Sequence, residues 1–450
     1  MSESTSGSEF LLGIEEYLRY LKHHDQAEIT HTLSRTMSLE NKTIASVKAY
    51  MQDLGSEIQD SNRELADLLH GVVKSETIVD IQKSLLHFLG KTIDDQLVID
   101  LIFSVIKSNT NETTYRALLQ YIGKKEQVDN FTVDLIFGII KQSSINVYRP
   151  LLQYISKSIE DKFLHDLIHG TTKSDDLLFA YKAVLQYTGR SLPEDKKSMA
   201  DMAFAIQRAI DSDSFEDDFI KAHLSMLDRH FLNDKIFRGI NNCIKSNIER
   251  TVINDAFSRS QIRSKVWLIN ELLSIDYNYD NILVMAGWFG QLKAIYEKQC
   301  TYAKMRILEI DKFACETSDY VFNLSNLENY KVKSVNADIN NLVLHKNGYE
   351  WDVENFRDGT KYSEKFLPNL IINTSAEHMK EDWFFQIKFK ELETDPIVAI
   401  QSNNLFDIDE HINCVHSVEH MKKKFPMREI LYQGELQLKG YKRVMLIGRP

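Results

Sequence analysis

The stretch Asn281-Ile-Leu-Val-Met-Ala-Gly-Trp-Phe-Gly290 decides the fold of the second half of this chain. An apolar run ends there at two glycines, and a helix-like segment follows. A second apolar run, Met305-Arg-Ile-Leu-Glu-Ile-Asp311, then ends in acidic residues. Strand, glycine turn, helix, strand and carboxylate is the order in which an open α/β sheet builds a nucleotide pocket. The glycines let the backbone approach the ligand, and the acid binds the ribose hydroxyls.

Short apolar runs continue this pattern to the end of the chain. The predicted strands cover residues 281–286, 305–310, 331–336, 370–373, 396–401, 428–433 and 441–448. The Lys439-Gly440 turn between the last two runs predicts a closing antiparallel pair. Because helical stretches alternate with the earlier strands, we expect an α/β domain over residues 256–450.

This succession of elements resembles the class I S-adenosylmethionine-dependent methyltransferases over roughly residues 262–450. The resemblance implies a Rossmann-like fold, S-adenosyl-L-methionine as cofactor, and transfer of its methyl group to an oxygen or nitrogen nucleophile. The closing antiparallel pair fits this family better than the dehydrogenases, whose sheets are usually all parallel. A nicotinamide-linked oxidoreductase is therefore the less favoured interpretation.

The resemblance also implies the cofactor-binding residues. The turn after the first strand would pass the methionine part of the cofactor, and it consists of Gly287, Trp288, Phe289 and Gly290. We expect Gly287→Val to block the cofactor and leave the fold intact. The two aromatic residues stand where many members have small residues and a third glycine. They can stack on the ligand or pack between helix and sheet, and packing is the better expectation.

Acidic residues after the next two strands complete the implied cofactor site. Glu309 matches the usual ribose binder, with Asp311 as its rival. Asp338 would accept a hydrogen bond from the adenine amine, and Ile339 would pack on the adenine ring.

The turn after the fourth strand would face the methyl group. Methyl transfer requires donor and acceptor in line and, for a protonated acceptor, a base. Glu377 and His378 are the candidate bases, and Asn373 and Ser375 are candidates for holding the substrate. The alternatives are that His378 caps a helix, that Glu377 is a surface carboxylate, and that Asn373 and Ser375 only shape the turn. The polar cluster Gln401–Asn404 allows the same two interpretations.

Motifs that would identify the methyl acceptor do not occur in the sequence. The turn has no Asn/Asp-Pro-Pro-aromatic phrase, which amino-methylating members carry, and the chain has no Pro-Cys nucleophile for carbon-5 cytosine methylation. The segment Glu410–His420 is rich in metal-ligand residue types, including His416 and His420. Its spacing matches no standard zinc pattern, so we expect a solvated segment and no metal. Lys422–Lys424 is interpreted as a solvated face.

The first half of the chain repeats itself. Leu85-Leu-His-Phe-Leu-Gly90 is echoed at residues 118, 151 and 184, so successive starts differ by 33 residues. A second phrase, Leu68-Leu-His-Gly-Val-Val-Lys-Ser75, recurs at residues 101, 135 and 167. Two apolar segments of helical spacing per unit predict an α-helical hairpin array of solenoid type. The recurring Phe88, Tyr121, Tyr154 and Tyr187 are predicted core residues.

We therefore expect a multidomain protein in which an all-α helical-repeat half precedes the α/β domain. Residues 1–60 are predicted to be a helical cap and residues 61–255 the array. The phrases match neither ankyrin nor tetratricopeptide units. Because solenoids present extended surfaces, the array is expected to bind a macromolecular partner or substrate.

Composition narrows the class of partner. The chain has 450 residues and a formal net charge of −11. A negative charge does not indicate binding to nucleic acid, although a nucleic-acid partner stays possible. No apolar run is long enough to span a bilayer, and no secretory signal is recognisable, so we expect a cytoplasmic protein without membrane contact. The alternative is that the chain is a structural or scaffold protein associated with a phage, in which the methyltransferase-like domain has lost catalysis.

Overall fold

The computed structural model divides the chain into two compact units. One unit contains Met1–His31 and Phe231–Pro450, and the other contains Thr32–His230. The domain boundaries at residues 60 and 255 stay predictions, because a compact unit of a structure need not be a domain that folds alone. The structure describes residues 7–108, 111–124, 129–140, 147–173, 176–231, 234–246, 248–275, 277–321, 331–339, 342–345, 347–354, 360–380, 382–386 and 392–450.

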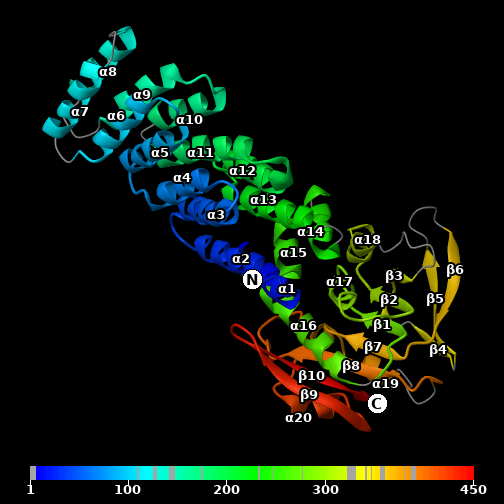
Figure 1. The fold of residues 1–450 in the computed structure, drawn as a ribbon. Helices are drawn as coiled ribbons and strands as arrows, with labels where there is room; N and C mark the ends of the chain where they lie inside the picture. Colours follow the sequence, from blue (N-terminus) through cyan, green and yellow to red (C-terminus); the bar gives the residue numbers. More distant parts are fainter. Residues whose placement is uncertain are drawn as a thin grey trace. The chain divides into compact units, whose positions relative to one another are not determined.

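The described part of the Thr32–His230 unit is built from helices (Figure 1). After the end of α2 (His24–Thr36) come α3 (Lys42–Ile58), α4 (Arg63–Lys74), α5 (Ile78–Thr92), α6 (Gln96–Ile106), α7 (Asn111–Lys124), α8 (Asn130–Ile140), α9 (Tyr148–Ser158), α10 (Lys162–Lys173), α11 (Leu177–Ser191), the 3-10 turn η1 (Glu194–Lys196), α12 (Lys197–Ala209) and α13 (Phe215–His230). Among the described helices, none has the length and the low charge of a membrane span.

The predicted helical hairpins are confirmed. One repeated phrase lies in α4, α6, α8 and α10, and the other lies in α5, α7, α9 and α11. Each hairpin also carries an ion pair between its two helices, which the sequence analysis did not anticipate. The N–O distances are 2.6 Å for Asp67–Lys91, 3.7 Å for Asp100–Lys124, 2.8 Å for Asp134–Lys157 and 2.9 Å for Asp166–Arg190. Such exposed pairs contribute about 0–1 kcal/mol each, so they reflect the recurring geometry more than they cause it.

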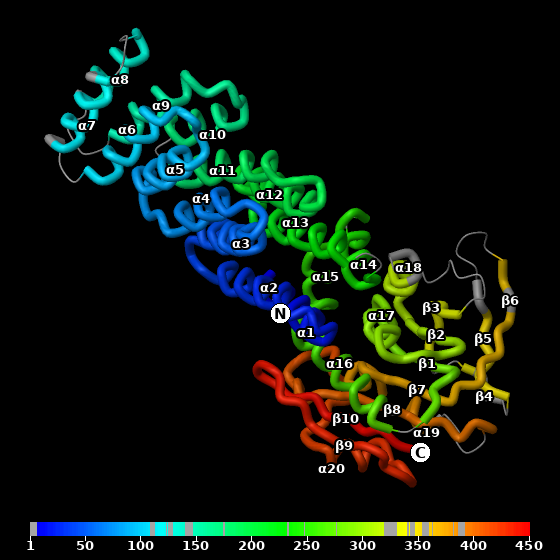
Figure 2. The backbone as a smooth tube through the Cα atoms, in the orientation of Figure 1, coloured from blue at the N-terminus to red at the C-terminus, as the bar shows by residue number. Residues whose placement is uncertain are grey.

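The array folds back on itself instead of extending as an open solenoid. In an open solenoid each repeat contacts only its neighbours. Here α3 lies beside α11, and α5 lies beside α10 and α11 (Figure 2). Side-chain contacts join early helices to late ones. Tyr50 Oη donates a hydrogen bond of 3.2 Å to the Met199 carbonyl, and Gln82 Nε2 donates one of 3.4 Å to the Thr171 carbonyl. The ring centroids of Phe88 and Tyr187 are 5.8 Å apart.

This doubling explains the recurring aromatic residues. Their rings meet between the outgoing and the returning helices, where the hydroxyls of Tyr121 and Tyr154 are 2.5 Å apart. Phe88, Tyr121 and Tyr154 are buried, and Tyr187 is half-buried. The repeats therefore supply a shared core between two helical layers, as expected of residues that cannot be buried within one hairpin.

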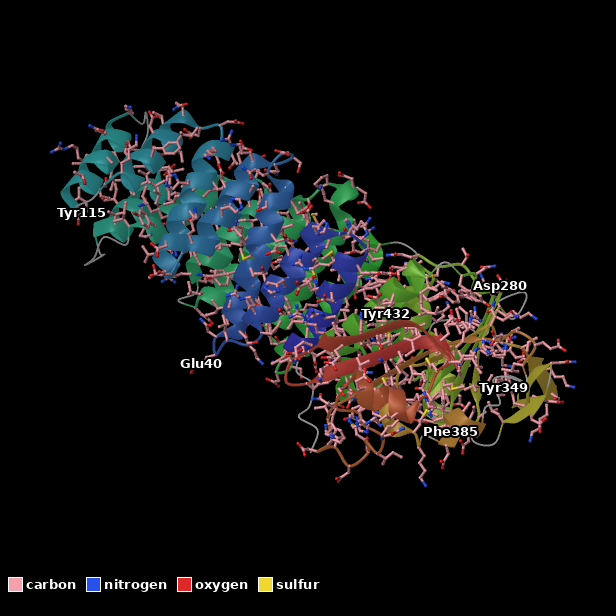
Figure 3. All side chains as sticks on the ribbon, turned by 90° about the horizontal axis from the view of Figure 1, so that it is seen from below. Glu40, Tyr115, Asp280, Tyr349, Phe385 and Tyr432 are labelled. Carbon is pink, nitrogen blue, oxygen red and sulfur yellow. The ribbon has the colours of Figure 1, made fainter. Side chains whose placement is uncertain are left out.

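The other unit combines helices with two sheets. Its helices before the sheet are α1 (Gly7–Tyr20), α14 (Lys235–Lys245), α15 (Arg250–Ala256) and α16 (Arg259–Ser274). Helix α1 packs along α16. The indole of Trp267 on α16 donates a hydrogen bond of 3.1 Å to the hydroxyl of Tyr432, which Figure 3 labels. Helix α16 is thereby held against the end of the large sheet.

The large sheet has seven strands in the order β3-β2-β1-β7-β8-β10-β9. The first five in this order are mutually parallel, and β10 is antiparallel to both β8 and β9. The strands are β1 (Asn281–Met285), β2 (Lys304–Glu309), β3 (Val332–Asn336), β7 (Leu370–Asn373), β8 (Ile397–Asn403), β9 (Glu429–Gln437) and β10 (Lys442–Arg449). The predicted fold class and the closing antiparallel pair are confirmed.

Shorter elements connect these strands. The helices are α17 (Gln291–Tyr296), α18 (Lys312–Val321), the 3-10 turn η3 (Ala376–His378), α19 (Asp382–Gln386) and α20 (Val418–Lys424). A three-stranded antiparallel sheet lies between β3 and β7 in the sequence, and no prediction covered it. Its strands are β4 (Val343–His345), β5 (Gly348–Glu354) and β6 (Lys361–Phe366).

The order of the strands creates a crevice beside β1. Strand β1 pairs with β2 on one side and with β7 on the other. The strands that follow β1 are thus added first on one side of it and later on the other, so the strand order reverses at β1. At the carboxyl edge Met285 lies beside both Leu308 and Asn373, and Glu309 lies beside Asn336. Open α/β sheets bind ligands outside the carboxyl ends of their strands at such a switch point.

Candidate active site

A cavity of about 1670 Å³ opens at this carboxyl edge. Its floor is formed by residues that follow β1, β2, β3, β7 and β8, and helices α15 and α16 and the β9–β10 turn add walls. Most of the predicted site residues line it, namely Gly287, Trp288, Glu309, Asp338, Ile339, Ser375, Glu377 and His378. The other predicted residues, which its lining does not include, are Phe289, Gly290, Asp311 and Asn373.

The glycine turn adopts an unusual backbone. Ala286, Trp288 and Gly290 all have positive φ, at 51°, 47° and 77°. Left-handed backbone costs a non-glycine residue about 1–2 kcal/mol, so this turn is strained at two positions. The Trp288 amide donates to Glu309 Oε2 at 2.8 Å, which fixes the turn against the end of β2.

Gly287 also has a packing role, which the sequence did not predict. A Cβ added there would lie 2.1 Å from Ile307 Cγ2, in β2. The glycine therefore lets the turn pack on its own sheet, and a valine would disturb this packing. We therefore expect Gly287→Val to lower the stability of the domain, and whether the fold survives this change stays a prediction.

The two rival acids after β2 occupy different environments. The Glu309 carboxylate is buried, lines the cavity, and accepts backbone hydrogen bonds from Trp288 at 2.8 Å and Asp311 at 3.1 Å. Asp311 is exposed, and its Oδ1 accepts from the Phe313 amide at 2.8 Å in the first turn of α18. Asp311 thus caps a helix, and Glu309 is the acid that faces the cavity.

The remaining predicted cofactor residues differ in exposure. Asp338 and Ile339 are half-buried and line the cavity directly after β3. The Trp288 indole is half-buried at the cavity, whereas Phe289 is 2% exposed. Their rings stack with centroids 5.2 Å apart. Of the two aromatic residues, Phe289 packs in the interior and Trp288 faces the cavity.

On the opposite side of the cavity, the turn after β7 holds Glu377 in a polar network. Glu377 Oε1 accepts from Asn403 Nδ2 at 2.9 Å and pairs with the Arg443 guanidinium at 3.2 Å. Asn373 Oδ1 accepts from the Ser375 amide at 2.9 Å, so Asn373 shapes the turn from inside. Ser375 is half-buried, and His378 is exposed.

The polar cluster at the end of β8 supports this network. Asn403 Oδ1 accepts from the Leu405 amide at 2.9 Å while its Nδ2 binds Glu377. Gln401 Nε2 donates to the Ser264 carbonyl at 3.0 Å and thereby ties β8 to α16. Both side chains are buried; Asn403 also lines the cavity, whereas Gln401 acts on the site through its neighbours.

Three charged residues of the site were not predicted. Lys265 on α16, Arg443 on β10 and Asp255 on α15 all line the cavity, and Lys265 and Arg443 are buried. Burial lowers the pKa of Lys265 to about 7, with the charge of Arg443 acting in the same direction and Asp255 and Glu377 opposing it. Burial also raises the pKa of Asp255. No local pattern in the sequence distinguishes these residues from ordinary helix and strand charges.

His411 is a further unpredicted residue, although the segment that contains it was noted for its metal-ligand types. Its ring lies at 83° to that of His378, with centroids 4.6 Å apart. Its Nδ1 is 3.1 Å from the Leu405 carbonyl, and burial lowers the pKa of its imidazole. His416 and His420 instead stack on each other at 5.4 Å. His416 precedes α20, which begins at Val418, and His420 belongs to it.

Known structures resemble the α/β part of the chain. N-methyltransferase NodS from Bradyrhizobium japonicum WM9 is 10% identical, with a TM-score of 0.30, and covers 42% of this chain and 96% of its own. Ribosomal protein L11 methylase from Lactobacillus delbrueckii subsp. bulgaricus is 10% identical, with a TM-score of 0.28, and covers 43% and 79%. Geranyl diphosphate methyltransferase in complex with GPP and sinefungin is 11% identical, with a TM-score of 0.31, and covers 44% and 80%.

No protein-family model and no curated protein matches the sequence. The likeness to solved structures concerns the C-terminal two-fifths of the chain. At these identities and TM-scores it supports no assignment of substrate or activity.

Proposed function

We propose that the cavity binds S-adenosyl-L-methionine and that the protein transfers the methyl group to an oxygen or nitrogen nucleophile. The observation that carries this proposal is the convergence of the Gly287–Trp288 turn, Glu309 and Asp338 on one cavity. These residues follow three adjacent parallel strands, at the switch point where open α/β sheets bind nucleotides.

The residues present fit this cofactor by their chemistry. Two backbone amides orient the Glu309 carboxylate, and about half of its roughly four lone-pair sites remain for ribose hydroxyls. Asp338 offers an acceptor for the adenine amine, and Ile339 offers apolar surface for the ring. The cavity of about 1670 Å³ exceeds the usual small-molecule range of about 300–1000 Å³, which leaves space for an acceptor beside the cofactor.

When bound, the cofactor supplies a methyl group activated by its sulfonium. The protein must then hold the acceptor in line and help it lose its proton. We assign the acceptor side to Glu377 and His378, which follow β7 at the cavity. Ser375 is placed to contact either ligand, and Asn373 keeps the turn in shape from inside. The acceptor gains a methyl group, and its proton leaves to the solvent.

We also propose that the folded-back array binds the macromolecular partner or substrate. Phe131, Phe137, Phe163 and Phe179 are between 45% and 58% exposed there. Lys157 lies over the Phe131 ring at 4.8 Å, and Arg190 over the Phe163 ring at 4.9 Å. Aromatic rings with cations beside them suit contact with either a protein or a nucleic acid.

Calorimetry on the full-length protein tests the cofactor. We expect one equivalent of S-adenosylhomocysteine or S-adenosylmethionine to bind, and NAD to give no heat of binding. Binding of NAD in place of the adenosyl compounds would support an oxidoreductase. Binding of none of the three would support the scaffold alternative with a degenerate domain.

A further inference from the structure

Glu377, His378 and His411 form a cluster at the acceptor side of the cavity. One potential ligand atom from each residue lies within 4.8 Å of the others. Glu377 and His378 belong to η3, directly after β7, and His411 belongs to the loop that follows β8. Two neighbouring strand ends thus bring together two imidazoles and one carboxylate, although His411 lies 33 positions after His378 in the sequence.

The carboxylate has one oxygen engaged and one without a partner. Glu377 Oε1 is held by Asn403 and Arg443, at 2.9 Å and 3.2 Å. Glu377 Oε2 is buried and has no hydrogen-bond partner among the described residues. The residue as a whole is 1% exposed and lines the cavity. A buried carboxylate oxygen without a partner is costly, and the cost is removed if a ligand binds there.

His411 is oriented in the way that metal-binding histidines usually are. Its Nδ1 lies 3.1 Å from the Leu405 carbonyl, and this contact requires the proton to be on Nδ1. The lone pair is then on Nε2. Histidine ligands to metals almost always donate their other N–H to a carbonyl or carboxylate, which fixes the tautomer and the ring. The His411–Leu405 contact is such an outer contact within this chain.

We propose that Glu377, His378 and His411 bind one divalent first-row transition cation. Two imidazoles and one carboxylate suit Mn²⁺, Fe²⁺, Co²⁺ or Zn²⁺ better than Mg²⁺ or Ca²⁺, which prefer oxygen ligands throughout. Three protein ligands leave coordination positions open toward the cavity, as in catalytic sites. Arg443 binds the far oxygen of Glu377, so it orients the carboxylate and leaves Oε2 for the cation.

The cation site narrows the class of methyl acceptor, and this part rests on the proposed function. An acceptor hydroxyl that coordinates the cation has a lowered pKa, as bound water does. The O–H bond breaks and its proton goes to water. The oxygen then forms a bond to the methyl carbon as the S–CH₃ bond breaks, and the sulfonium becomes a neutral thioether. The acceptor is therefore an oxygen nucleophile, and the charge of the cation is unchanged.

Metal titration of the full-length, chelator-treated protein tests the site. Free Mn²⁺ is followed by its electron paramagnetic resonance signal, and Zn²⁺ by competition with a chelating dye. We expect one equivalent to bind, and His411→Ala and Glu377→Gln each to weaken binding by at least about tenfold. His411→Ala keeps the test decisive if Glu377→Gln fails to fold. The control is His416→Ala/His420→Ala, which removes the neighbouring histidine pair and is expected to bind the cation normally.

The outcomes separate this inference from the proposed function. Absence of Mn²⁺ and Zn²⁺ binding overturns the cation site, as does binding that the control abolishes and His411→Ala does not. S-adenosylhomocysteine binding that persists in chelator would then leave the cofactor proposal standing. Cation binding in a protein that binds no S-adenosylhomocysteine upholds the site and overturns the role in methylating a hydroxyl.

Discussion

Glu309→Gln, compared with Asp311→Asn, tests the assignment of the cofactor site most directly. The two acids are two positions apart, and from the sequence alone either could bind the ribose. In the structure the Glu309 carboxylate lines the cavity, and the Asp311 carboxylate caps α18. The two substitutions are matched because each replaces a carboxylate by an amide of nearly equal size.

The magnitude follows from the hydrogen bonds. The Glu309 carboxylate already accepts from two backbone amides, at 2.8 Å and 3.1 Å, and would accept from the ribose with its other lone pairs. In glutamine one oxygen becomes an N–H₂ donor. Because each oxygen of Glu309 accepts from a backbone amide, this donor faces a backbone N–H in either orientation, and it can no longer accept from a ribose hydroxyl. Hydrogen bonds to charged groups contribute about 1.5–3 kcal/mol each. Loss of one therefore weakens S-adenosylhomocysteine binding by roughly 10-fold to 150-fold.

Calorimetry measures this effect, and thermal unfolding checks that both variants fold. Asp311→Asn keeps a side-chain oxygen for the Phe313 amide, so we expect unchanged affinity. An unaffected Glu309→Gln, or a loss of affinity confined to Asp311→Asn, would refute the placement of the ribose at the end of β2.

Two further predictions concern stability, and the four tryptophans, all in residues 267–383, report both by fluorescence. Gly287→Ala should lower the unfolding free energy by about 1–3 kcal/mol, because the added Cβ would lie 2.1 Å from Ile307 Cγ2. If the double variant with Ile307→Ala loses the sum of the two single-variant losses in unfolding free energy, this contact is contradicted. Lys265→Met should remove a pH dependence from urea unfolding. The pKa of Lys265 is about 7 in the folded chain and about 10.4 in the unfolded chain. Between these pH values the unfolded chain binds one more proton than the folded chain. The unfolding free energy therefore rises with pH in this range, by at most about 1.4 kcal/mol per pH unit. An identical slope in Lys265→Met would contradict the assignment.

Local patterns account for the parts of the fold that the sequence predicted. The strands at the centre of the sheet are buried on both faces, so they appear as continuous apolar runs. The predicted first and last residues lie within a few residues of the ends of β1, β2, β7 and β8. The sheet β4-β5-β6 was missed because β5 and β6 mix charged with aromatic residues and β4 has only three residues. The repeat period predicted each helical hairpin but carried no information on the reversal that brings α5 beside α11.

The candidate site shows the same division. Residues that follow a strand directly, such as Glu309 and Glu377, could be placed from the strand order, since carboxyl ends of parallel strands share one edge. Lys265, Arg443 and His411 come from a helix, an antiparallel strand and a long loop. Only the packing of α16, β10 and the loop after β8 brings them to the cavity, and no spacing in the sequence encodes that packing.

The distribution of unfavourable features favours a ligand-binding cavity over a purely structural domain. Ala286 and Trp288 hold left-handed backbone, Lys265 is buried with a depressed pKa, and Glu377 keeps a buried oxygen without a partner among the described residues. Each of these features costs stability and would be easy to replace in a scaffold. All four residues line the same cavity. Strain and perturbed charges concentrate where a protein binds or transforms a ligand, because there the ligand offsets their cost.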